Sequence, residues 1–220
     1  MPALASSRLM WARLRPNAAP LLLIVGLPVV ALAFWGFGSQ EAERWKQVLL
    51  IGWLIVSLLP AAVLGRQERS VRSRWKSLPR SSGEHWLGAY FALLPISLVS
   101  AEILTVGAWL LGPAAYRHPM LLLVCAVAVA AMVSLGMAIA AWSDDEWKLT
   151  GLLGLALLVL AIPLFPGAPA LAFELVPTGQ AHAALVALTT SVQGGLYALI
   201  KLVMAGAVFM VVGILGESRN

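Results

Sequence analysis

Charged side chains are scarce in this sequence, and cysteine is almost absent. Only 11% of its 220 residues are Asp, Glu, Lys or Arg, whereas 60% are hydrophobic. A soluble globule of this size needs more polar side chains to cover its surface, so the composition excludes a water-soluble protein. The single cysteine, Cys125, has no partner for a disulfide within the chain, and its place inside an apolar run is typical of a small buried hydrophobe.

The sequence also lacks the motifs of common enzyme classes. No GxxxxGK[ST] loop contains any of the four lysines, so we do not expect the chain to hydrolyse nucleotides. The three histidines fall in three different connections, without HExxH or paired Cys/His spacing, and no GxSxG is present. We therefore predict no catalytic residues, no metal and no cofactor in this chain.

Six apolar runs fill most of the chain instead. Each run is long enough to cross a bilayer as a helix, which satisfies its own backbone hydrogen bonds in hydrocarbon. The sequence therefore predicts an all-α, polytopic membrane protein in which residues 1–220 form a single transmembrane domain. The predicted spans are Pro20 to Gly36, Gln47 to Leu64, Leu87 to Leu111, Pro119 to Trp142, Leu149 to Phe165 and Gly195 to Leu215.

Lys and Arg residues are distributed unequally between the two sides of the predicted membrane. If both termini are cytoplasmic, the inner segments hold eleven of the fifteen basic residues and the outer segments hold three. Basic residues favour the cytoplasmic side, so we predict cytoplasmic termini and a bacterial inner-membrane location. The basic residues lie between apolar runs without interleaved aromatics, which indicates contact with anionic lipids and no nucleic-acid partner.

Two further segments are predicted to lie at the membrane surface. Residues 1–19 contain a short amphipathic stretch, Ser7 to Arg15, which suits an interfacial helix; the alternative is a frayed basic tail. Residues 166–194 are mostly apolar but broken by prolines and glycines, with Glu174 and Pro177 among them. We predict one or two short helices that re-enter the outer half of the membrane. The alternative is an outward extension of the last span.

The cytoplasmic segment 65–86 holds six of the fifteen Lys and Arg residues and an amphipathic pattern. Val71, Trp75 and Leu78 recur at i, i+4 and i+7 along the stretch Glu68 to Arg80. A helix with this pattern would lie under the membrane and dock into a groove of a cytoplasmic partner. The alternative is that the charges only set the topology and that Trp75 anchors in the headgroups.

This segment and the order of the spans resemble the membrane subunits of type-2 ATP-binding-cassette (ABC) exporters. That family has six spans, an interfacial helix before the first, and a loop of the approximate form E-R-x-x-G-T-L-x-x-L-L-x-x-P-[VI]-S between the second and third. Placing Pro79 on the family proline brings Glu68 and Arg69 onto the E-R pair and Trp75 onto an apolar position. The chain departs from the pattern at Ser70, where the family usually has glycine.

The resemblance implies that two permease chains form an export path for a lipophilic or amphipathic cargo. It also implies a separate ATP-binding subunit, which would hold ATP and Mg²⁺ and would push on a coupling helix in the 65–86 segment. The residues expected to contact that subunit are Glu68, Arg69, Val71, Arg72, Trp75, Leu78 and Pro79. A second interpretation is a non-transporting membrane scaffold or assembly factor whose basic loop recruits a cytoplasmic partner.

Two ionisable residues lie inside predicted spans, Glu102 in the third and Lys201 in the sixth. Counted from the outer ends at about 1.5 Å per residue, they lie at similar depths. An isolated charge there costs about 2.5 kcal/mol or more. We therefore predict that Glu102 faces the transport pathway or pairs with Lys201. The alternative is that Lys201 reaches outward alone and Glu102 is protonated.

Overall fold

The computed structural model describes residues 26–27, 29–31, 35, 41–72, 82–165, 167–190 and 192–219, and within these ranges the chain is helical and contains no strand. The predicted interfacial segment 1–19 and most of the predicted first span lie outside the described residues. The described elements are α3 (Ala42–Arg72), α4 (Ser82–Leu111), the 3₁₀ helix η2 (Ala114–Tyr116), α5 (Met120–Trp142), α6 (Glu146–Ala161), the 3₁₀ helix η3 (Ile162–Leu164), α7 (Ala170–Leu175), α8 (Pro177–Thr190) and α9 (Val192–Ser218).

Five stretches of the described chain are helical, long and apolar enough to span a membrane. They correspond in position to the second through sixth predicted spans, and their bounds are Glu43–Gln67, Gly83–Leu111, Met120–Trp142, Glu146–Leu164 and Gly194–Ser218. Four of the stretches lie within a single α-helix, and the fourth in chain order joins α6 to η3, so their backbone hydrogen bonds are made internally. The fold is therefore that of an all-helical protein with the features of an integral membrane protein.

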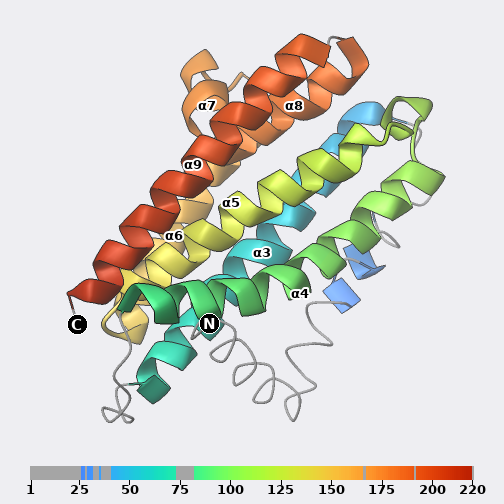
Figure 1. Cartoon of the computed structure of the whole chain (residues 1–220). Helices are drawn as coiled ribbons and strands as arrows, with labels where there is room; N and C mark the ends of the chain where they lie inside the picture. The colour runs from blue at the N-terminus through green and yellow to red at the C-terminus, as the bar shows by residue number, and fades with distance from the viewer. Residues whose placement is uncertain are drawn as a thin grey trace.

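Helix α5 lies at the centre of the bundle. It packs against α3, α4, α8 and α9, and Figure 1 shows it running between α4 and α9. Most of its inward positions carry Ala, Val or other small residues, including the buried Cys125. Small side chains let neighbouring helices approach closely, which matters in lipid because apolar burial alone gives little driving force there.

We call the end of the bundle at which Arg66, Lys148 and Arg219 lie the basic end. At this end α3 finishes, α4 begins, α5 connects to α6 and α9 finishes (Figure 1). The Arg66 Nη1 atom donates a hydrogen bond to the Ser143 carbonyl at 2.9 Å. The Arg219 guanidinium lies 4.3 Å from the centre of the Trp142 ring. These contacts hold the ends of α3, α5 and α9 together. We call the opposite end of the bundle the far end.

Helix α3 is longer than the span Gln47 to Leu64 predicted from the sequence. It contains 31 residues and ends at Arg72, a length of about 46 Å at 1.5 Å per residue. Residues 68–72 of the predicted coupling helix therefore continue α3 and do not begin a separate helix. No proline or glycine interrupts residues 66–72, and most of them are good helix formers. The rest of the predicted coupling helix, 73–80, lies outside the described residues.

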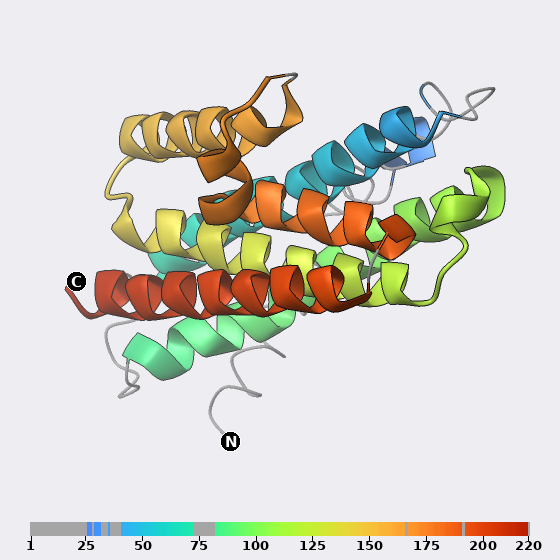
Figure 2. The same ribbon diagram turned by 90° about the horizontal axis from the view of Figure 1, so that it is seen from above.

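The broken segment after α6 contains two helices, α7 and α8, in agreement with the expected one or two. Helix α8 begins beside the end of α6, where the Thr178 hydroxyl donates a hydrogen bond to the Leu160 carbonyl. From there it runs alongside α9 (Figure 2). Because α8 packs against α9, it does not extend the last span outward. Re-entry of this segment into the membrane stays a prediction.

Candidate functional site

The predicted partner-binding segment leaves the bundle at the basic end. Helices α3 and α4 pack against each other, and the last residue of α3 and the first of α4 both lie there (Figure 1). Glu68, Arg69, Val71 and Arg72 belong to the last turns of α3, where the structure describes only the backbone. Three further candidates lie outside the described residues, namely Trp75, Leu78 and Pro79. Their contact with a partner stays a prediction.

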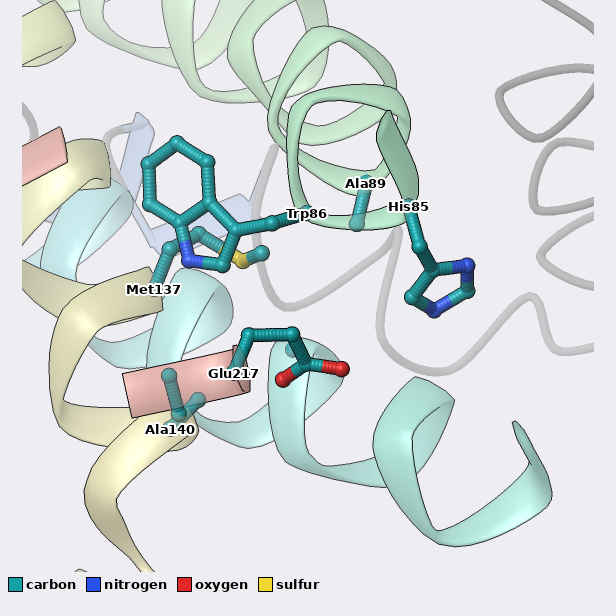
Figure 3. Close-up of a pocket in the computed structure, with 8 residues that line it drawn as sticks. His85, Trp86, Ala89, Met137, Ala140 and Glu217 are labelled. Carbon is teal, nitrogen blue, oxygen red and sulfur yellow. The ribbon is translucent and has the colours of Figure 1, made fainter. Parts of the chain in front are cut away.

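A small pocket lies near the end of α3 and the start of α4, where these helices meet α5 and α9. Figure 3 shows the Glu217 side chain between Trp86 on one side and His85 on the other. The volume is about 10 Å³, which is room for one water molecule and excludes a cargo molecule. The lining residues are Gly65, His85, Trp86, Ala89, Met137, Ala140, Ala141 and Glu217. The pocket is therefore a small gap between four helices, lined mostly by apolar residues and by two ionisable ones, His85 and Glu217.

The main polar cluster joins α3, α7 and α8 at the far end. The Lys46 Nζ atom lies 2.6 Å from Glu43 Oε2 and 3.1 Å from His182 Nε2. The His182 ring packs edge to face against Phe173, with ring centres 4.9 Å apart. Lys46 is only 8% exposed. We call Glu43, Lys46, Phe173 and His182 the far-end cluster.

Burial is the first reason why the pKa of His182 lies below the ordinary histidine value. The Lys46 ammonium lowers the pKa of His182 further, whereas the Glu43 carboxylate raises it. The imidazole is therefore held neutral at neutral pH. A neutral imidazole can accept a hydrogen bond from an ammonium group, which fits the short distance to Lys46.

Lys201 pairs with Glu174 of α7, and the expected pair between Lys201 and Glu102 is not formed in the described structure. The Lys201 Nζ atom lies 3.8 Å from Glu174 Oε2 and 4.6 Å from the centre of the Tyr197 ring. The Gln180 Nε2 atom donates to the Glu174 carbonyl at 2.8 Å. Because α7 and α8 fold back beside α9, Glu174 reaches Lys201 from a segment outside the spans.

Glu102 lies at the edge of an exposed apolar face of α4. Its neighbours on that face, Val99 and Val106, are 58% and 37% exposed, and Glu102 itself is half-buried. That Glu102 faces a transport pathway stays a prediction.

The far-end cluster was not predicted from the sequence. Lys46 is one of the three basic residues counted in the outer segments, His182 is one of the three scattered histidines, and the two are 136 residues apart. One signal was present: both ionisable residues adjoin apolar runs, where an unpaired charge is costly. Among the described residues, no group of three or more His, Cys, Asp or Glu side chains is placed to hold a metal ion.

No protein-family model matches this chain, and the comparison with curated proteins gives no match. The resemblance to ABC exporters therefore rests on the order of the spans and on the pattern at 68–81.

Proposed function

We propose that this chain is the membrane-spanning subunit of an ABC exporter, which moves a lipophilic or amphipathic cargo with energy from a separate ATP-binding subunit. The observation that carries the proposal is the arrangement of α3 and α4 at the basic end. Helix α3 is about 46 Å long, whereas the hydrocarbon layer is about 30 Å thick, so its last turns project beyond the lipid tails. The connection to α4 would then reach a cytoplasmic partner.

The packing of α3 on α4 supports the transmission of force between the two ends of the bundle. The Trp53 Nε1 atom of α3 donates a buried hydrogen bond to Thr105 Oγ1 of α4 at 3.0 Å. Gly52 of α3 faces Leu104 of α4 so closely that a Cβ there would meet the leucine side chain. A push on the connection would therefore move both helices as one unit. Because α3 also carries Lys46, the movement would reach the far-end cluster.

Exposed apolar helices supply surface for lipid and for a second permease chain. Only 11% of the span in α6 and 28% of the span in α9 are buried within the chain. The exposed side chains there are large and apolar, and Leu158 of α6 is 71% exposed. We propose that two copies, or two homologous chains, assemble in a bacterial inner membrane, with the cargo path between them.

Co-purification with the ATP-binding partner tests the proposal. Replacing Val71, Trp75 and Leu78 together by Asp removes the apolar stripe, so we expect at least a tenfold loss of the ATPase recovered with the tagged chain. The matched control is Trp147→Asp, because Trp147 is 88% exposed in the first turn of α6, which begins at the same end. Unchanged recovery of the ATPase would exclude docking at 68–80. Recovery of a partner without ATPase activity would favour the scaffold function.

A further inference from the structure

We propose that His182 is a proton-binding site that holds α8 against α3 while it is neutral and releases α3 when it takes up a proton. The inference uses only contacts at the far end and does not depend on the proposed ABC function. It assigns a conformational role to a histidine, a lysine and a glutamate that come together only in the folded chain.

The protonation state of Lys46 follows from its contacts. Its Nζ atom lies 2.6 Å from the Glu43 carboxylate, so it is an ammonium group with three N–H donors and no acceptor. His182 Nε2, 3.1 Å from the same atom, must therefore accept the hydrogen bond. An imidazole accepts at Nε2 only when it is neutral, with its proton on Nδ1.

Protonation of His182 removes the lone pair on which this contact depends. The imidazolium would place two positive charges about 3 Å apart with no acceptor between them, which is unfavourable at low dielectric. Lys46 cannot turn away into water, because its side chain is only 10% exposed. The repulsion is therefore relieved by moving the first turns of α3 away from α8.

The other charged groups near α8 cannot replace the hydrogen bond between Lys46 and His182. Among the described residues, Glu43 is the acidic group that acts on His182, and its carboxylate is already engaged by Lys46. Glu41, just before α3, is paired with Arg44. On α7, Glu174 pairs with Lys201 of α9. Tyr116 of η2 also belongs to an element beside α8, and phenols do not ionise between pH 5 and 8. In α5 and α6, the described charged residues, Glu146 and Lys148, lie at the basic end.

The first turn of α8 stays in place when His182 is protonated. Thr178 bonds to the Leu160 carbonyl, and the Gln180 amide bonds to the Glu174 carbonyl at 2.8 Å. Neither hydrogen bond involves a group that titrates. The change is therefore confined to the contact between α8 and α3, which would open the far end without detaching α8 from α6 and α7.

Spin-label distances across the contact test this inference. In a Cys125→Ala background, labels are placed at Arg44→Cys on α3 and Val186→Cys on α8, both of which are exposed. Distances are measured in nanodiscs between pH 8 and pH 5. Burial lowers the pKa of His182 from 6.5, so the contact is intact above pH 6.5 and is lost as the pH falls through the lower folded-state value. We expect a shift to longer distances with its midpoint below pH 6.5.

Two variants test whether His182, and not another titrating group, causes the pH-dependent change in distance. His182→Gln keeps an acceptor for Lys46 without a titrating group, so it should keep the short distances at every pH. His182→Lys carries a permanent positive charge, so it should show the long distances already at pH 8. A pH shift that persists in His182→Gln, or no shift in the chain with native His182, would overturn the inference. Nitrogen-15 spectra of histidine-labelled native protein report the Nε2 protonation state even if a variant fails to fold.

Discussion

Glycine at position 136 allows two helix backbones to come close. A Cβ on Gly136 of α5 would lie 2.7 Å from the Leu58 carbonyl oxygen and 2.7 Å from the Ala61 Cβ, both on α3. A backbone carbonyl cannot turn aside as a flexible side chain can. Any larger residue at this position must therefore push α3 and α5 apart.

We expect Gly136→Ala to destabilise the protein by about 1 to 3 kcal/mol, because the added methyl group overpacks the contact between α3 and α5. The measurement is the unfolding temperature of the purified protein in one detergent. The matched control is Gly154→Ala in α6, where a Cβ would meet no atom within 4 Å. The control should be neutral or stabilising by up to about 1 kcal/mol, since alanine is the better helix former. Equal unfolding temperatures for Gly136→Ala and the native chain would contradict a tight contact.

At the scale of elements, α9 carries glycine at three positions where a tryptophan ring or a helix backbone packs against it. Gly206 faces the Ala131 backbone of α5, and Gly216 faces the Trp142 ring. Another close approach joins α9 to the start of α4, where a Cβ on Gly213 would lie 2.6 Å from the Trp86 ring. This contact adjoins the pocket at the basic end, so it holds the start of α4 against the end of α9.

We expect Gly213→Ala to lower the unfolding temperature, because the buried Trp86 ring has no room to move. Combining it with Trp86→Leu should cost less than the sum of the two single changes, since the shorter side chain leaves space for the methyl group. The comparison is a double-mutant cycle on thermal unfolding. Gly195→Ala on the same helix is the control, because its Cβ would meet only Ala187 at 3.4 Å. Strict additivity would show that the glycine and the indole do not contact each other.

At the scale of the whole molecule, the expected orientation follows from the number of Lys and Arg residues on each side. Eleven of the fifteen fall in the segments predicted on the side of the basic end, whereas Arg44, Lys46 and Arg117 fall in the segments predicted on the opposite side. Basic residues favour the cytoplasm, so the basic end is expected to face inward. With this orientation, α3 would end and α4 would begin on the cytoplasmic side.

We expect a membrane-impermeant maleimide to label Arg117→Cys in intact cells and Trp147→Cys only after the membrane is opened. Both positions are exposed and lie on opposite sides of the predicted membrane. Both changes are made in a Cys125→Ala background. The native chain is a second control, since Cys125 is fully buried and should not react. Labelling of Trp147→Cys in intact cells would reverse the orientation and exclude the proposed ABC function.

Long apolar runs determined the fold class and the order of the spans without any tertiary information. An apolar stretch of some 20 residues has one stable way to cross a bilayer, because only a helix satisfies its own backbone there. The burial of Cys125 and the breaks around Pro177 could be predicted for the same reason. The end of α3 was predicted less accurately than its apolar part, because helix-forming polar residues continue the helix to Arg72 after the apolar run has ended.

Only the tertiary structure decided which ionisable groups meet. Hydropathy describes each segment separately, whereas the partner of a charge depends on how all the helices pack. Glu174, not Glu102, reaches Lys201 because α7 and α8 fold back beside α9. Lys46 likewise meets His182 across 136 residues. The sequence alone therefore determined that charges near the apolar layer need partners, and the packing of α7 and α8 determined which partners they have.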